Sequence, residues 1–465
     1  MTAIETLAAW ITEAEAEHPA IAVGRARNAF LDTVGCIVAG AEVAPTTIIR
    51  ETVAGWGTGP ATLIGTDQRL AAPWAALVNG TAAHARDFDD WEAPGNSHAS
   101  AVLVPALLAL AEERGLGGGA LIDAYIVGFE VLTRVAEVMT VEHYERGWHP
   151  TGTLCTLAAT AACARLLGLD QARAGAGLSV AASMAAGVKA QMGYMAKPTH
   201  AGLAAKAGVM AASLAERGLV GSPAALDGPG GWATLTAGTG LDAFAGLAAS
   251  LGAPLALEQA STIVKRHPSC GCTHRAVDAA LAIREAHEPA PANIAGVICR
   301  MSRPFAETVS FRQPATPNAA MFSMSYCTAV ALIQGRLGLD DFTPEALHRP
   351  EIQKLEARVE IDAYAPRNTT SHMTEDDPDT VIVEMVSGER FEETVGIPLG
   401  APGRPIDDHA LATKFRHCAS WTLDQQNVER ALARLSSLDE LADIASLTAH
   451  LSASASTVSA ARSRS

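Results

Sequence analysis

The spacing of apolar residues changes from a helical to a strand period near residue 290, and this change constrains the fold more than any other feature. Before about residue 260, apolar side chains recur every three or four positions, as in AIAVGRARNAFLDTVGCIVAG (20–40), SAVLVPALLALAEERG (100–115) and ALIDAYIVGFEVLTRVAEVM (120–139). The chain is 49% hydrophobic but only 5% aromatic, so these helices consist mainly of small aliphatic residues. Such helices can approach closely, and we expect a large, dense helical domain.

After residue 290 the pattern indicates strands. Apolar and polar residues alternate in NIAGVICRMSRP (293–304) and ARVEIDAY (357–364), and DTVIVEMVSGERFEETVG (379–396) is typical of a hairpin that turns at Ser387 and Gly388. A helix, NAAMFSMSYCTAVALIQG (318–335), lies between them, and helical periodicity returns in DDHALATKFRHCAS (407–420).

These patterns predict a mainly α protein with two domains, because 465 residues are too many for one hydrophobic core. We expect residues 1–265 and 403–451 to form the helical domain and residues 266–402 to form a smaller α+β domain inserted in it. The segment 452–465, SASASTVSAARSRS, is too polar to bury a core and is expected to be disordered.

The formal net charge of −16 and the absence of a basic run exclude nucleic acid and anionic membranes as expected partners. The acidic N-terminal segment lacks the features of a signal peptide, and the uncharged stretches are shorter than a membrane span, so we expect a soluble, cytoplasmic protein. Eight cysteines in this length do not suggest a disulfide framework, and CGC (270–272) has the wrong spacing for zinc. No metal site is expected.

Four expected helix starts carry histidine or lysine. They are NSHASAVLVPALLAL with His98, GWHPTGTLCTLAATAACARLL with His149, MAKPTHAGLAAKAGVMAASLAERG with Lys197 and His200, and VKRHPSCGCTHRAVDAALAIREA with Lys265 and His267. A cation at this end opposes the helix dipole, whereas an anion is stabilised there. One such histidine is more often a cap or packing residue, but four starts in an acidic chain favour a site for an anion such as a small carboxylate.

The segment HARDFDDWEAPGNSHASA (84–101) places three acids, Asp87, Asp89 and Asp90, beside these cations. They either take part in proton chemistry or cap the next helix, and capping suits Asp89 or Asp90 better than Asp87. Tyr326 lies within an apolar helix, where spacing alone favours a core tyrosine with a partner for its hydroxyl.

Together, NGTAAHARDFDD with the following HAS, GWHPTGT, MAKPTHAG, VKRHPSCGCTH and FSMSYCTAVALIQG, in this order, resemble the motifs of the MmgE/PrpD family. The resemblance extends to KFRHCAS and covers nearly the whole chain. The family includes 2-methylcitrate dehydratase, cis-aconitate decarboxylase and iminodisuccinate epimerase. The resemblance implies a helical domain with a smaller α+β lid, a homodimer, an active site in the cleft between the domains, and no metal or organic cofactor.

The resemblance also implies roles for individual residues. The catalytic residues it gives are Asp87, His98, His149, Lys197, Lys265 and Tyr326. We expect the two lysines to clamp carboxylates, the two histidines to act as acid and base, Asp87 to orient one of them and Tyr326 to donate from the lid. Substrate contacts are expected from Trp91, His200 and His267. Trp91 stands where many relatives have threonine, and the segment up to His98 differs in spacing, so a citrate-like substrate is not implied.

The expected function is therefore that of a cofactor-independent lyase, a hydro-lyase of the 2-methylcitrate dehydratase type, that acts on a small di- or tricarboxylate beside a carboxylate group. Epimerisation, as of iminodisuccinate, and decarboxylation, as of cis-aconitate, remain alternatives within the family. A non-catalytic protein that binds a carboxylate is an alternative of another class. Such a protein would need the lysines but not His98 and His149.

Overall fold

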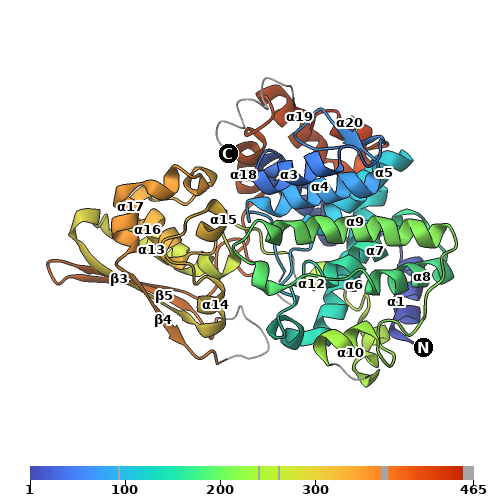
Figure 1. Ribbon diagram of the computed structural model, residues 1–465, viewed down its shortest axis with the longest axis horizontal. Coiled ribbons are helices and arrows are strands. Elements are labelled where there is room, and N and C mark those ends of the chain that lie inside the picture. Colours follow the sequence, from blue (N-terminus) through green and yellow to red (C-terminus); the bar gives the residue numbers. More distant parts are fainter. Residues whose placement is uncertain (93–94, 239–240, 260–261, 368–374, 454–465) are drawn as a thin grey trace.

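The computed structural model describes the whole chain except residues 93–94, 239–240, 260–261, 368–374 and 454–465. Most of the segment expected to be disordered therefore lies outside the described residues. The described residues form two large hydrophobic cores and two small clusters. One large core is built from residues 3–257 together with 411–453, and the other from residues 270–395. Figure 1 shows the two bodies side by side, with the C-terminal helices packed on the first.

The larger body is helical. Its longer helices are α1 (Ala3–Glu13), α2 (Ala20–Gly40), α3 (Ala44–Val53), α4 (Ala72–Ala85), α5 (Ser100–Arg114), α6 (Gly118–Glu145), α7 (Leu154–Leu166), α8 (Gln171–Ala182), α9 (Ala196–Glu216), α18 (Asp408–Ala419) and α19 (Gln425–Ser436). Shorter helices are α10 (Trp232–Ala237), α11 (Leu247–Ser250), α12 (Ala256–Gln259) and α20 (Ala445–Thr448). Two short strands, β1 (Ala61–Thr62) and β2 (Arg69–Leu70), pair in a region where the sequence pattern predicted only helix.

Helices α4 and α9 lie close together because both carry glycine where they meet. A Cβ atom at Gly80 would lie 2.8 Å from the Cα of Gly202, and a Cβ atom at Gly202 would lie 2.2 Å from the carbonyl oxygen of Leu77. Real side chains do not tolerate such contacts, so both positions require glycine. This approach brings the end of α4, with His84, beside the start of α9, with Lys197.

The smaller body is a four-stranded mixed sheet covered by helices. Its strands are β3 (Ile294–Ser302), β4 (Val359–Tyr364), β5 (Asp379–Met385) and β6 (Arg390–Val395), in the order β4-β3-β5-β6. Strands β3 and β4 are parallel, and the other neighbours are antiparallel. The helices are α13 (His274–His287), α14 (Arg303–Thr308), α15 (Pro317–Ala320), α16 (Met324–Gln334) and α17 (Pro350–Glu356). Helices α13 and α16 pack on each other and on the sheet.

The predicted fold class, mainly α with a smaller α+β part, is confirmed. One expected helix, 318–335, is two helices instead, α15 and α16, because the chain turns at 321–323 and Ser323 caps α16 by accepting a hydrogen bond from the backbone of Tyr326. Within the described residues, no single helix has the length and hydropathy to cross a membrane. Only α2 and α3 together, bent by 84°, reach those values.

Candidate active site

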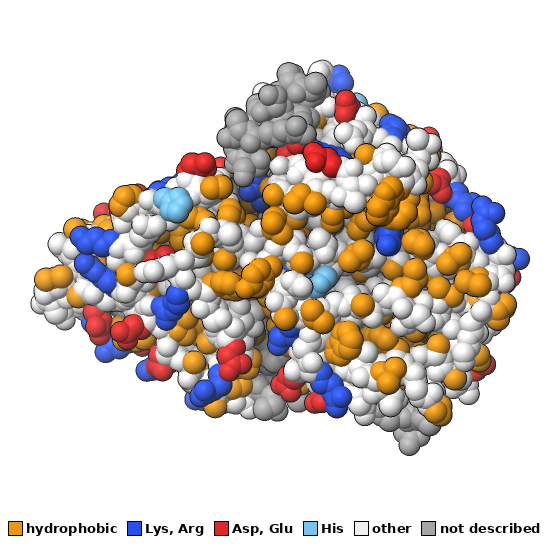
Figure 2. All heavy atoms as spheres, viewed as in Figure 1, with side chains coloured by type: hydrophobic (Ala, Val, Ile, Leu, Met, Phe, Trp, Pro, Cys, Tyr) orange, Lys and Arg blue, Asp and Glu red, His pale blue; other side chains and the backbone are white. Residues whose placement is uncertain are grey.

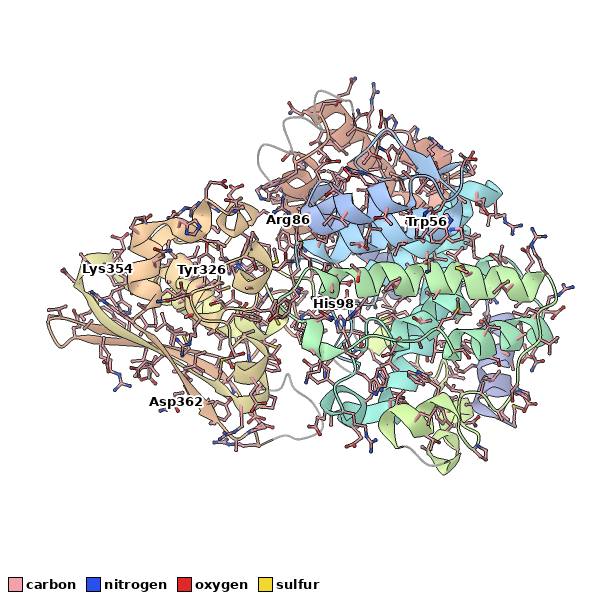
Figure 3. All side chains as sticks on the ribbon, in the orientation of Figure 1. Trp56, Arg86, His98, Tyr326, Lys354 and Asp362 are labelled. Atoms are coloured by element: carbon pink, nitrogen blue, oxygen red, sulfur yellow. The ribbon has the colours of Figure 1, made fainter. Side chains whose placement is uncertain are left out.

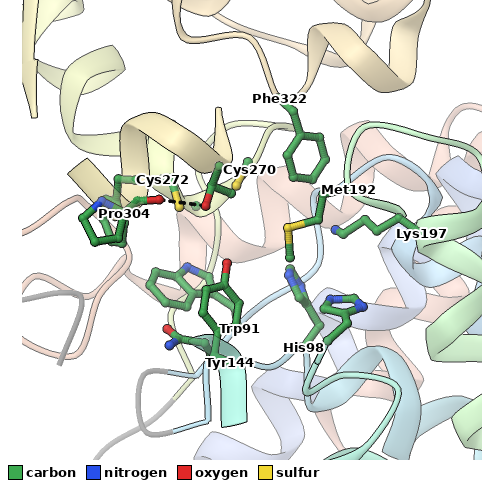
Figure 4. Close-up of a pocket in the computed structure, with 14 residues that line it drawn as sticks. Trp91, His98, Tyr144, Met192, Lys197, Cys270, Cys272, Pro304 and Phe322 are labelled. Carbon is green, nitrogen blue, oxygen red and sulfur yellow. Dashed lines mark hydrogen bonds between the residues drawn. The ribbon is translucent and has the colours of Figure 1, made fainter. Parts of the chain in front are cut away.

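A cavity lies between the two bodies, and three of the ionisable residues that the sequence singled out, His98, His149 and Lys197, line it. The helical body contributes Trp91, Asn96, His98, Tyr144, His149, Met192 and Lys197 to its lining, and the smaller body contributes Cys270, Gly271, Cys272, Pro304, Phe305, Thr308 and Phe322. Figure 4 shows Lys197 and His98 on one side of this cavity, with Cys270, Cys272 and Pro304 across from them. Its lining combines apolar side chains with a few polar groups, as the lining of small-molecule sites does.

Asp87 joins the two lysines beneath the cavity. Its Oδ1 accepts hydrogen bonds from the ammonium groups of Lys265, at 2.6 Å, and Lys197, at 3.0 Å, and its carbonyl oxygen accepts another from Lys265, at 2.8 Å. Asp87 has a φ of 48°, a strained value for a residue with a side chain, and the two ion pairs offset that strain. Burial alone would raise the pKa of Asp87, but the two ammonium groups hold this pKa well below its usual value.

Asp89, and not Asp87, contacts the histidines. The Oδ2 atom of Asp89 lies 2.8 Å from Nδ1 of His84 and 2.9 Å from Nδ1 of His98. A carboxylate only accepts, so Nδ1 of His84, which is hydrogen-bonded to Asp89, carries the proton and its Nε2 is left to accept one, whereas His98 meets Asp89 at ion-pair distance only. The expectation that Asp87 orients or polarises a histidine stays a prediction: the lysines hold its carboxylate, and the carboxylate that contacts the histidines is that of Asp89.

The second histidine of the cavity, His149, is paired with His200. Their Nδ1 atoms lie 2.9 Å apart, so one donates while the other accepts, and the pair is not doubly protonated. Burial lowers the pKa of His98 to about 3 and that of His200 to about 4, and burial with the nearby Lys197 also holds the pKa of His149 well below its usual value. At neutral pH without a ligand, these imidazoles are uncharged.

Asp90 points away from the cavity into a buried hydrogen-bond chain. Its carboxylate accepts from the hydroxyl of Ser100 at 2.6 Å, and that hydroxyl lies 2.7 Å from the hydroxyl of Tyr125. Burial and the neighbouring Asp32 raise the pKa of Asp90 to about 7. The expectation that Asp90 caps the next helix is wrong, because α5 begins without a side-chain cap and Asp90 accepts from the hydroxyl of Ser100 and not from a backbone N–H.

Lys414 of α18 supports the loop that carries these acids, a contact that sequence reasoning did not predict. Its ammonium group donates to the carbonyl oxygen of Phe88 at 2.8 Å and lies 2.6 Å from the buried carboxylate of Asp32 on α2. The segment after the smaller body thus returns to the floor of the site.

Five of the expected site residues do not line the cavity in this structure: Asp87 and His200, whose contacts are described above, and three more. Lys265 is fully buried under Asp87. Tyr326 donates its hydroxyl to the carbonyl oxygen of Asp341, and Figure 3 shows it within the smaller body, away from His98. His267 lies 2.9 Å from the carboxylate of Asp278, on α13. The contacts with substrate expected of these three residues stay predictions.

The expected helix starts are only partly present. Lys197 and His200 do lie in the first turn of α9, and His98 is two residues before α5. His149 lies five residues before α7, and Lys265 nine residues before α13, so these two lie in the loops that lead to the helices. His149 and Lys265 are therefore positioned by loops and not by helix ends.

Several residues of the site were not predicted individually. His84 and Asp89 stood in the quoted acid-rich segment, and their five-residue separation across the end of α4 was the available signal. No sequence signal marked Met192, Phe305 and Phe322, the apolar residues of the lining, because they match ordinary core positions and meet only when the two bodies pack.

One group in the described part of the chain has donor atoms close enough to hold a metal ion, namely His84, Asp87, Asp89 and His98, whose atoms lie within 4.8 Å of one another. The two ammonium groups on Asp87 already balance its charge, and a divalent cation there would repel both lysines. This donor set fits an arrangement of ion pairs better than a metal.

In a comparison with known proteins, both halves of the chain match domains of the same family. Residues 5–242 match the MmgE/PrpD N-terminal domain, and residues 267–458 match the MmgE/PrpD C-terminal domain. Human cis-aconitate decarboxylase is 30% identical over 396 residues, which cover 82% of this chain and 80% of that protein. A cis-aconitate decarboxylase-like protein of Aspergillus oryzae is 28% identical over 95% of this chain and 96% of its own, and the cis-aconitate decarboxylase of Aspergillus terreus is 27% identical over 92% and 91%. The chain belongs to the MmgE/PrpD family.

Proposed function

We propose that this family enzyme is a cofactor-independent decarboxylase of a small unsaturated polycarboxylate of the cis-aconitate type. Two kinds of observation support the proposal: the named relatives that match most of the chain are cis-aconitate decarboxylases, and the lining of the cavity includes both a lysine and several apolar side chains. The sequence favoured dehydration, which the relatives support less than the decarboxylation alternative.

The observation that carries the proposal is the division of the cavity into a cationic and an apolar part. Lys197 offers its ammonium group beside His98 and His149, while Met192, Phe305 and Phe322 form an apolar wall. The ring of Phe322 lies 5.2 Å from Nζ of Lys197. A carboxylate that must be retained is stabilised at the cationic part. A carboxylate against the apolar wall loses hydration, which favours its departure as neutral CO₂.

The reaction balances with residues of this chain alone. The bond between the substrate and the departing carboxylate breaks, and its electron pair forms a new double bond while the existing double bond shifts. The far carbon of the old double bond takes up one proton. Negative charge that develops on the conjugated carboxylate is stabilised by Lys197, and His98 or His149 delivers the proton.

The histidines are uncharged in the free enzyme, so the acid must form when substrate binds. A polyanion beside His98 favours the imidazolium, because two unit charges about 4 Å apart interact by about 4 kcal/mol near a protein surface. Asp89 stabilises that imidazolium at Nδ1. Binding should therefore take up a proton from solvent. Since about 4 kcal/mol raises the pKa of His98 on binding by about three units from its free value of about 3, affinity should fall as the pH rises between about 3 and about 6 and should level off above that range.

Dehydration of a hydroxy acid is the second candidate, because the side-chain amide of Asn96 lines the cavity and could hold a hydroxyl group. Incubation of the enzyme with citrate, 2-methylcitrate, cis-aconitate and iminodisuccinate in D₂O, followed by NMR, separates the reactions. Decarboxylation consumes only cis-aconitate and incorporates one deuterium into the product. Loss of water from either citrate would support dehydration, and exchange of an α proton with inverted configuration would support epimerisation.

For the assembly we propose a homodimer that forms through the outer face of α9 and its neighbours. Figure 2 shows hydrophobic side chains gathered on this face, and Ile48, Tyr194, Met195 and Leu203 are exposed there. Exposed apolar area of this kind often marks a protein interface. In sedimentation experiments Leu203→Glu should convert a dimer to a monomer, whereas Val386→Glu, at an exposed turn of the smaller body, should not. A monomeric wild-type protein would refute the proposal.

A further inference from the structure

The wall of the cavity that faces the histidines carries two thiols that the proposed decarboxylation does not use. Cys270 and Cys272 both line the cavity, and Figure 4 shows them across from Lys197 and His98. The other six cysteines are buried elsewhere in the two cores and do not line the cavity. Cys270 and Cys272 are therefore the thiols that a small molecule in the cavity would meet.

The local backbone brings the two thiols together. Cys270 caps the short 3₁₀ turn Gly271–Thr273, which leads directly into α13, and its backbone N–H donates to the carbonyl oxygen of Met321 at 3.0 Å. Gly271 separates the cysteines and lies against the ring of Trp91, where a Cβ atom would be only 2.9 Å from Cε2. The two side chains thus project from one turn held between Trp91 and the smaller body.

We propose that Cys270 and Cys272 are a modification site at which hydrogen peroxide oxidises the pair to a disulfide and so closes the active-site cavity. In the first step Cys270 attacks the peroxide O–O bond, forms a sulfenic acid and releases water. In the second step the thiol of Cys272 attacks that sulfur and forms the S–S bond, releasing a second water molecule. The two thiols lose two electrons, and the peroxide is reduced to two water molecules.

The chemistry of the pair assigns the order of these steps. The neighbouring thiol of Cys272 and the nearby Lys265 ammonium group lower the pKa of Cys270. The neighbouring sulfur of Cys270 and burial raise the pKa of Cys272. Cys270 therefore attacks, because a thiolate is the reactive form, and Cys272 resolves the sulfenic acid.

Closure follows from the position of the pair. A disulfide would draw Cys270 and Cys272 together and displace Gly271 against the ring of Trp91, which already touches it. A change there narrows the cavity opposite Lys197 and His98. The inference does not depend on which polycarboxylate is the substrate, since the thiols can be measured directly.

Trypsin provides a direct readout, because cleavage after Arg266 and Arg275 releases the peptide HPSCGCTHR, which contains both thiols and no other cysteine. After brief treatment of the folded protein with hydrogen peroxide, the peptide should be lighter by two hydrogen atoms and should return to its original mass with dithiothreitol. Citrate or cis-aconitate in the cavity should slow the reaction. In Cys272→Ser, dimedone should capture a sulfenic acid at Cys270, whereas in Cys270→Ser capture at Cys272 should be at least tenfold slower.

Cys163→Ala, which removes a thiol from the core of the helical body, is the matched control and should oxidise at 267–275 as the wild type does. Activity, measured against each protein's own untreated value, should fall in the wild type and the control and persist in the double serine variant. If both thiols stay reduced while other cysteines react, or if each is oxidised separately without a disulfide, the proposal is wrong.

Discussion

Asp87→Asn is the substitution whose consequence is most directly fixed by the geometry. The carboxylate lies 2.6 Å from the ammonium nitrogen of Lys265 and 3.0 Å from that of Lys197, and all three groups are buried. Removal of one partner from a buried ion pair costs about 3–5 kcal/mol of folding free energy. The loss of folding free energy also has an upper limit, because a buried lysine without its partner can give up its proton. At pH 7, about 3.4 units below the ordinary lysine pKa, this deprotonation costs about 1.4 kcal/mol per unit, a total similar to the range above.

The pH dependence of the stability of Asp87→Asn shows whether the ammonium group of Lys265 has lost its partner. Burial alone would lower the pKa of Lys265, and Asp87 raises it, so the variant should fold with this pKa below the unfolded value. The unfolded chain then binds more protons than the folded one, and the variant should regain up to about 1.4 kcal/mol per pH unit between pH 7 and 9 relative to the wild type. Urea unfolding followed by circular dichroism measures both quantities.

Asp87→Asn combined with Lys265→Met removes the charge and its partner together, and serves as the control. It should recover part of the lost stability. If Asp87→Asn costs less than about 1 kcal/mol at pH 7 and shows no added pH dependence, the lysines are not held by this carboxylate, and the ion-pair description of the site fails.

Three further outcomes are expected. His149→Ala should lower kcat by about 10² to 10⁴ and change substrate binding much less, because it removes a proton-transfer group; an unchanged kcat would remove His149 from the mechanism. Trp91→Thr should change the preference between a larger and a smaller polycarboxylate, measured as the ratio of their kcat/KM values, by an amount equivalent to about 1–3 kcal/mol, since Trp91 lines the cavity and packs on Gly271. A constant ratio would mean that Trp91 is a core residue only. EDTA should leave activity intact, and loss of activity restored by one divalent ion would show that His84, Asp87, Asp89 and His98 hold a metal.

Sequence periodicity predicted the two bodies because each depends on a local repeat. The strand alternation in Val297, Cys299 and Met301 matches a buried face of β3, and the small residues of α4 and α9 do pack closely. The break between α15 and α16 was not predicted, because a turn inside an apolar run leaves no periodic signal.

The sequence predicted which residues gather in the site better than it predicted which of them contact one another. The acid-rich segment and the histidines marked the right region, yet spacing could not tell which acid meets which base. That depends on the left-handed turn at Asp87, which directs its carboxylate to the lysines and leaves Asp89 to His84 and His98. The apolar wall arises from contact between residues far apart in sequence, which no local pattern records. The two thiols are neighbours in the CGC segment, but their place in the cavity wall depends on the same long-range packing.

The amount of CO₂ released per molecule of cis-aconitate consumed tests the central proposal most directly. Decarboxylation in the cavity predicts one CO₂ for each substrate molecule, at a rate that His149→Ala lowers by about 10² or more. Consumption of cis-aconitate without CO₂, through addition of water, would contradict the proposal and favour the dehydratase alternative.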